Sequence, residues 1–91
     1  MSQRRAIVSV IGQDRVGIIA QVTNILAEKN VNILDINQTI LNDFFTMMML
    51  VDVADLENLD SLQHELTTLG ESLGVTINIQ LAEIFKAMHR V

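Results

Sequence analysis

The apolar residues of this chain change spacing several times between the period of a strand and the period of a helix. Residues 6–11 form a short apolar run rich in β-branched side chains, which predicts a largely buried strand that stops at Gly12. Residues 16–29 have helical spacing, with Asp14 as a candidate N-cap and Asn30 as a left-handed terminator. The core face expected for this helix consists of Ile18, Ile19, Val22, Ile25 and Leu26.

The middle of the chain predicts a β-hairpin. Residues 33–41 alternate, with Leu34, Ile36 and Ile40 on one side and polar residues on the other, as expected for a strand with one wet face. Asn42 and Asp43 suit a two-residue turn, because both residue types tolerate positive φ. The returning run, 44–53, is apolar on both faces, which indicates a strand that is central in its sheet or covered by a partner.

A second helix has the clearest periodic signal. Its leucines, spaced three, four, three and four residues apart, are Leu59, Leu62, Leu66, Leu69 and Leu73. Asn58 can cap this helix and Gly74 can end it. Residues 76–81 then alternate strictly, which predicts an edge strand with one buried face. From Leu81 onward, Ile84, Phe85 and Met88 restore helical spacing and predict a short amphipathic helix.

This order of elements describes two split βαβ halves. We therefore expect an α+β chain with a ferredoxin-like βαββαβ sandwich: a four-stranded antiparallel sheet, two helices on one face and a short C-terminal helix. A length of 91 residues fits one domain, with a core at about 5–81 and a helical extension at about 82–91. The uncovered face carries Met48 and Leu50, so we expect a homodimer to cover apolar surface.

Composition excludes several kinds of function. The chain has no cysteine, which removes disulfides and thiolate chemistry. It has no Lys or Arg between Lys29 and Lys86, so a nucleic-acid or anionic-membrane surface is not expected. No apolar run approaches the ~18 residues of a membrane span. We expect a soluble, cytoplasmic protein without a cofactor or metal.

The first loop is the best candidate for a site. Gly12 and Gly17 flank the start of a helix, where free N–H groups and the helix dipole favour an anion such as a carboxylate. Asp14 and Arg15 can add an acceptor and a cation. The simpler interpretation is that the glycines only form the turn and Asp14 only caps the helix.

The loop residues Gly12, Asp14, Arg15, Gly17, Ile18 and Ile19, together with Val31-Asn32-Ile33, resemble the ACT domain family. The resemblance covers roughly residues 5–81. The tail from Ile84 to Arg90 is similar to that of stand-alone small bacterial ACT-domain proteins. Relatives often have Pro in place of Val16, and the serine-sensing ones have His and Asn in place of Gly12 and Asp14.

The resemblance implies a non-enzymatic, allosteric module that binds an amino acid or similar metabolite where two ACT units meet. Side-chain contacts would come from Asp14 and Asn32, and backbone contacts from Val16, Gly17 and Ile18. Asp14 suits an ammonium but would repel a carboxylate.

Two other functions remain open. One is an interaction module that regulates a partner protein without a ligand. The other is an acylphosphatase-like hydrolase that uses Arg15 against phosphate, which the charge of Asp14 opposes. His64 is expected to be solvated and His89 to pack or lie in an interface. Residues 47–49, all methionine, are expected to pack rather than to bind a soft metal.

Overall fold

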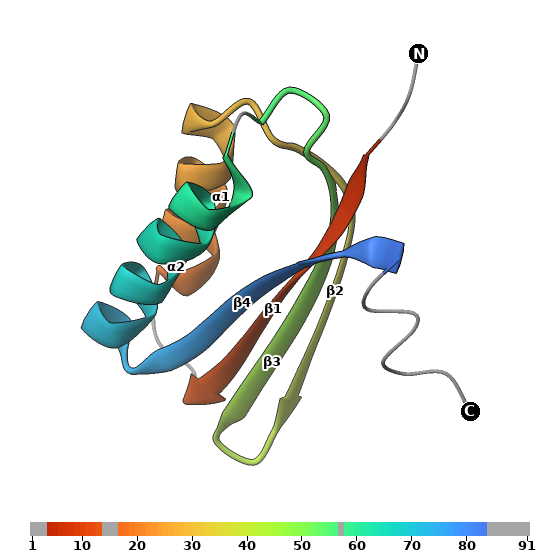
Figure 1. Cartoon of the computed structure of the whole chain (residues 1–91). Coiled ribbons are helices and arrows are strands. Elements are labelled where there is room, and N and C mark those ends of the chain that lie inside the picture. The colour runs from red at the N-terminus through yellow and green to blue at the C-terminus, as the bar shows by residue number, and fades with distance from the viewer. Residues whose placement is uncertain (1–3, 14–16, 57, 84–91) are drawn as a thin grey trace.

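The computed structural model describes residues 4–13, 17–56 and 58–83. Its elements, in chain order, are β1 (Arg5–Gln13), α1 (Ile18–Glu28), β2 (Asn32–Leu41), β3 (Phe44–Asp52), α2 (Leu59–Leu73) and β4 (Val75–Leu81) (Figure 1). The expected α+β ferredoxin-like order is confirmed. The chain is helical again at Ala82 and Glu83, while residues 84–91 of the expected C-terminal helix lie outside the described part.

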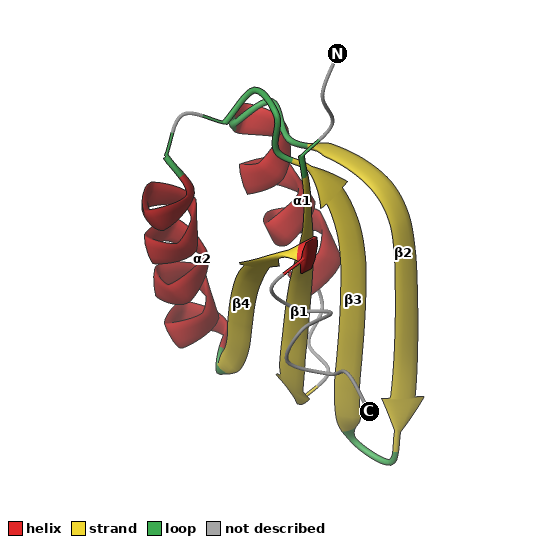
Figure 2. Ribbon diagram, turned by 45° about the vertical axis from the view of Figure 1, so that its right-hand side comes forward, coloured by secondary structure: helices red, strands yellow, loops and turns green. Residues whose placement is uncertain are grey.

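The four strands form one antiparallel sheet in the order β2-β3-β1-β4. In its central rows, Val8 of β1 pairs with Met49 on one side and with Ile79 on the other. Both helices lie against the same face of this sheet (Figure 2). None of the described helices is both long and apolar enough to cross a membrane.

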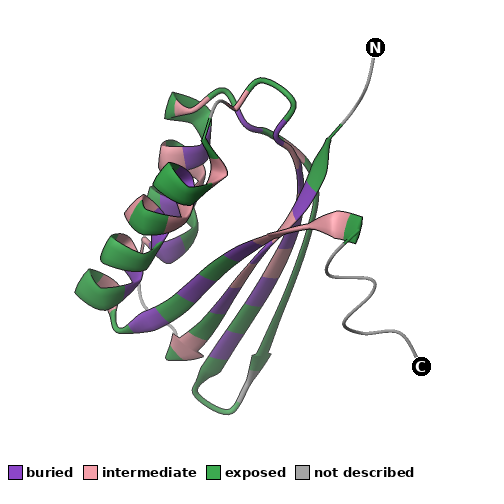
Figure 3. Cartoon of the chain, viewed as in Figure 1, coloured by how far each residue is buried: buried purple, intermediate pink, exposed green. Residues whose placement is uncertain are grey.

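The core lies between the helices and the sheet, and strands β1, β3 and β4 contribute alternate residues to it (Figure 3). Met47 and Met49 are fully buried there, whereas Met48 points to the opposite face and is partly exposed. Two of the three methionines therefore serve core packing, as expected, and Met48 does not. Among the described residues, no group of three or more His, Cys, Asp or Glu could hold a metal ion.

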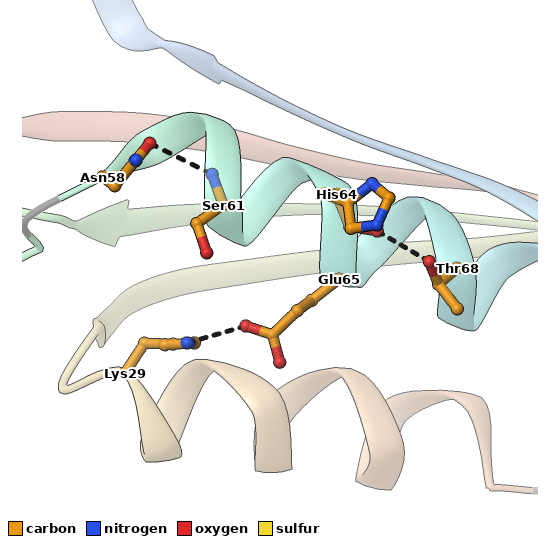
Figure 4. Close-up of polar contacts among 6 residues, drawn as sticks. All are labelled: Lys29, Asn58, Ser61, His64, Glu65 and Thr68. Carbon is orange, nitrogen blue, oxygen red and sulfur yellow. Dashed lines mark hydrogen bonds and ion pairs between the residues drawn. The ribbon is translucent and has the colours of Figure 1, made fainter.

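The expected turn residues take the expected backbone conformations. Asn30 has φ 60° after α1, and Asn42 has φ 58° in the turn between β2 and β3. Gly74 ends α2 with φ 76°, and Asn58 caps its start by accepting a hydrogen bond from the Ser61 amide at 3.1 Å (Figure 4). These local signals are sufficient to place the ends of α2 at the expected residues.

Two expectations about buried faces are wrong. Ile19 of α1 is 38% exposed, and only Ile18, Val22 and Leu26 of that helix are fully buried. On β2, Ile36 and Ile40 are 43% and 58% exposed, although Ile36 pairs with the buried Met49 and so faces the helix side. The reason is that β2 is an edge strand, where the core ends before it covers these side chains.

The opposite edge of the sheet is protected by a side chain. Gln63 of α2 donates from Nε2 to the Ile77 carbonyl at 3.2 Å, and its Oε1 accepts from the Ile79 amide at 2.8 Å. One side chain thus satisfies a donor and an acceptor of β4, the edge strand, much as a neighbouring strand would. On β2, within the described part of the chain, the Ile36 amide donates to the neighbouring Asp35 Oδ1 at 2.9 Å, but no side chain from another element bonds to this strand.

Replacing Gln63 by Ala is expected to destabilise the fold by about 1–2 kcal/mol, because two partly buried backbone groups of β4 lose their partners. Chemical denaturation measures this change. His64→Ala is the matched control, because His64 is exposed on the same helix and makes its hydrogen bond to Thr68 through its backbone carbonyl (Figure 4). Equal stability of the two variants would contradict the proposed role of Gln63.

Candidate functional site

Gly12 belongs to the strand rather than to the turn, because β1 continues to Gln13. It pairs with Phe45 on one side and with Val75 on the other. A Cβ at Gly12 would lie 2.6 Å from Val75 Cγ1 and 2.9 Å from Val75 Cα. The expectation that the strand stops at Gly12 is therefore wrong, and the close approach of β4 is what requires glycine there.

Gly17 is the N-cap of α1, in place of the expected Asp14. It has φ 90° and ψ 0°, a left-handed conformation that favours glycine, and no side chain caps the helix. The Gln21 amide donates to the Gly17 carbonyl at 2.9 Å, as the first turn of a helix requires. The amides of residues 18–20 precede that bond, so no intrahelical carbonyl is available to them.

The two helices of this fold begin differently. α2 has the Asn58 side chain on a first-turn amide and Asp60 in its first turn, so its positive end is compensated from within the chain. α1 has a glycine N-cap and no acidic residue in its first turn. Among the described residues, the start of α1 is thus the helix end that lacks a compensating anionic or polar side chain.

Of the other candidate residues in the first loop, Asp14, Arg15 and Val16 lie outside the described residues. The Ile18 side chain is 2% exposed and belongs to the core. Ile18 can therefore contribute only its main chain to a site. The expected backbone contact of Ile18 with a ligand stays a prediction.

Asn32 lies at the other end of the sheet from Gly12 and Gly17. It is exposed, begins β2 and pairs with Asp52, which pairs on its other side with Arg5. Gly12 is seven residues further along β1 than Arg5, or about 24 Å at ~3.4 Å per residue. One copy of the chain therefore does not bring Asn32 to the first loop.

The β2 edge is the most apolar border of the described structure. Leu34, Ile36 and Ile40 are all exposed there, and Phe44 follows just after the turn. The pairing with β3 shifts register between Ile33 and Asp35, leaving Leu34 in a bulge. The alternating pattern of residues 33–41 identified Leu34, Ile36 and Ile40 as one face of a strand, but we expected that face to be buried.

An ion pair between Lys29 and Glu65 links the C-terminal end of α1 to α2. Lys29 Nζ lies 2.8 Å from Glu65 Oε2 (Figure 4). The hydrogen bond and the charge of Glu65 raise the pKa of Lys29 above its usual value. The two side chains are 35% and 39% exposed, each more than a third, so this pair is a surface contact of small energetic weight.

Comparison with known proteins identifies the family. A family model described as ACT domain matches residues 4–80. The UPF0237 protein of Listeria innocua is 51% identical over 88 residues, which cover 96% of this chain and 99% of that protein.

The chain belongs to the ACT domain family. Among solved structures, an ACT domain protein from Streptococcus pneumoniae has 42% identity and a TM-score of 0.81, over 97% of this ACT chain and all of that one. The regulatory subunit of aspartate kinase from Thermus thermophilus shares the fold, with a TM-score of 0.65 at 22% identity. That match covers 87% of this ACT chain and 52% of the subunit. The resemblance read from the loop and from residues 31–33 is thus confirmed at the level of family and fold.

Proposed function

We propose that this ACT chain is a regulatory module that binds the carboxylate of an amino acid, or of a similar small metabolite, at the first turn of α1. The observation that carries the proposal is the start of α1 on Gly17, with no side-chain cap and no acidic residue in its first turn. An anionic ligand can accept hydrogen bonds from amides there and lies at the positive end of the helix dipole.

The ligand site is completed by a second copy of the chain. A two-fold symmetric contact between two β2 edges runs antiparallel, so each β2 start lies beside the end of the other β2. Phe44 of β3 pairs with Leu41, the last residue of β2, and with Gln13, the last residue of β1. The last residues of β2 and β1 therefore lie at the same end of the sheet. Asn32 of the partner subunit would then lie at the same end of the sheet as Gly17.

Exposed apolar side chains support β2 as the seam. A dimer that pairs these edges would bury Ile36 and Ile40 and give partners to the outer backbone groups of β2. The other edge, β4, already has Gln63 on its backbone. An edge-to-edge homodimer through β2 therefore covers the sheet edge that no other described element protects.

Ile36→Asp is expected to weaken this homodimer by about 100-fold or more, because it places two carboxylates in an apolar, symmetric contact. Sedimentation velocity at micromolar concentration measures the change. Ile11→Asp is the control, because Ile11 is 51% exposed on the other face of the sheet, away from β2. A monomeric wild-type chain, or a dimer that only Ile11→Asp dissociates, would contradict the β2 seam.

A thermal-shift screen of the twenty amino acids tests ligand binding. A ligand present at a hundred times its dissociation constant stabilises a folded protein by about 2.7 kcal/mol, which raises Tm by roughly 10 °C or more in a chain of this size. We expect one amino acid or a small group of related ones to do so. If none stabilises the dimer, the ligand-binding proposal is wrong.

A ligand-free interaction module is the second candidate function. The exposed apolar side chains of Leu34, Ile36 and Ile40 along β2 favour it, since apolar surface of this kind marks contacts with other proteins. A regulatory role fits both candidates, and the aspartate kinase subunit with this fold is itself named as regulatory. A screen in which no amino acid binds would favour this second function.

A further inference from the structure

The face of the sheet away from α1 and α2, here called the open face, is apolar in its middle. Side chains alternate along a strand, so the residues between the buried ones of β1, β3 and β4 point to this face. Its apolar members on β1 and β3 are Ile7, Ile11, Phe44, Met48 and Leu50. Both α1 and α2 lie on the opposite side of the sheet (Figure 2). The open face therefore offers apolar surface of the kind that marks contacts between proteins.

Charged side chains on the open face gather at one end of the sheet. Arg5 pairs with Asp52 there, and Asp35 pairs with Leu50 close by. The other polar side chains that strands β1 to β4 present on this face are uncharged and include Ser9, Asn37, Thr39, Thr46, Thr76 and Asn78. The whole chain has a net charge of −5, so two copies repel each other unless they meet through surface without carboxylates. This uncharged area favours a second copy over a basic partner, which acidic surface would attract.

The open face carries both a hollow and a protruding ring. The hollow, of about 530 Å³, is lined by residues that include Ser9, Ile11, Met48 and Asn78. Phe44 is 60% exposed at the start of β3, about 14 Å from Met48 at ~3.4 Å per residue. A two-fold axis between two stacked sheets, midway between ring and hollow, would place the Phe44 ring of each copy opposite the hollow of the other. The open face is thus complementary to itself.

The size of the open face determines which assembly it can hold. Four strands at ~4.8 Å spacing are about 19 Å wide, and seven residues at ~3.4 Å each are about 24 Å long, so one chain offers roughly 450 Å². Two single chains stacked in this way would bury roughly 900 Å² in total, less than the ~1,000 Å² that a specific interface needs. Two β2-joined dimers would bury roughly 1,800 Å², the size of a standard stable interface. The face is therefore large enough only when two copies already share a sheet.

We propose that two β2-joined dimers of this ACT chain stack through their open faces and form a tetramer, with Phe44 of each copy in the hollow of the copy opposite. The inference rests on the proposed β2 seam, because that seam doubles the area available for stacking. Sheets that pack face to face lie ~10 Å apart, with strand directions within about 30° of each other. Because α1 lies on the other side of the sheet, stacking leaves its first turn open to a ligand (Figure 2).

Sedimentation velocity from micromolar to millimolar concentration tests the tetramer on the full chain. We expect the wild type to pass from dimer to tetramer as its concentration rises. Ile11→Asp should weaken tetramer formation by about 100-fold or more, because carboxylates then face one another across an apolar contact. Phe44→Ala adds no charge and should weaken it by about 10-fold, because the hollow loses the ring that fills it. Dimers that persist in both variants show that these chains are still folded.

The matched control is Thr68→Asp, which adds the same charge at an exposed position of α2, on the opposite side of the sheet. It should form tetramers as the wild type does. A wild-type chain that stays dimeric at millimolar concentration, or Ile11→Asp and Phe44→Ala variants that form tetramers as readily as the wild type, would overturn the stacking.

Ile36→Asp separates this inference from the proposed seam. This variant should be monomeric, because the open face of one chain is too small to hold a second copy by itself. A wild-type dimer that Ile11→Asp dissociates and Ile36→Asp does not would contradict the β2 seam and support the contact between open faces. A wild-type dimer that Ile36→Asp dissociates, without any tetramer at millimolar concentration, would support the seam and contradict the stacking.

Discussion

Gly17→Asp is expected to weaken amino-acid binding by about 100-fold or more. The new carboxylate would stand at the first-turn amides of α1, where we place the ligand carboxylate, and like charges in a partly desolvated site repel by several kcal/mol. The fold should survive, because, among the described residues other than the chain neighbours of Gly17, the atom nearest to a Cβ at this position is Gln21 Nε2, at 3.7 Å. Isothermal titration with the amino acid found in the screen measures the change.

Two alanine variants separate charge from backbone strain. Gly17→Ala keeps the strain of a non-glycine residue at φ 90°, which costs roughly 1–2 kcal/mol of stability, but adds no charge. Gly74→Ala has the same kind of strain at φ 76°, with open space around the Cβ, at the C-terminal end of α2. We expect Gly74→Ala to bind normally and Gly17→Ala to bind much better than Gly17→Asp. Normal binding by Gly17→Asp would contradict the carboxylate site.

Gly12→Val is expected to destabilise the fold by about 2–3 kcal/mol and to lower Tm by about 10 °C or more. A Cβ at this position collides with both the side chain and the main chain of Val75, so the two strands must separate. Thermal unfolding of the ligand-free protein measures the loss. The effect belongs to folding, in contrast to the binding defect expected at Gly17.

A double-mutant cycle tests the cause of this destabilisation. Val75→Ala removes Cγ1, the atom that a Cβ at Gly12 approaches most closely, but leaves the contacts with Cα and Cβ. Gly12→Ala should therefore cost less in the Val75→Ala background than in the wild type, by about 1 kcal/mol. Additive effects would show that Val75 does not restrict residue 12.

Local signals were enough to predict much of the fold. The leucine spacing, Asn58 and Gly74 define α2 from both ends, because caps and periodicity depend only on neighbouring residues. Asn42 likewise marks the turn between β2 and β3. By contrast, the exposure of Ile36 depends on which strand lies at the edge of the sheet. Apolar and polar residues alternate along a strand in the same way whether or not the core reaches its apolar side chains.

The candidate site was less predictable for the same reason. Gly12 resembled a turn residue, yet its constraint comes from Val75, sixty-three positions later in the chain. Asn32 follows α1 closely in sequence, but the helix carries the chain back to the far end of the sheet. Only the strand topology shows that one copy of the chain places Asn32 at the other end of the sheet from the first loop.

Mixed dimers of Gly17→Asp and Asn32→Ala chains test the shared site most directly. If each site takes Gly17 from one copy and Asn32 from the other, a mixed dimer has one intact site and one doubly altered site. An equal mixture should then regain wild-type affinity in about a quarter of all sites, although each variant alone binds weakly. Titration calorimetry before and after subunit exchange measures this recovery. No gain in tight binding after complete exchange would contradict the account.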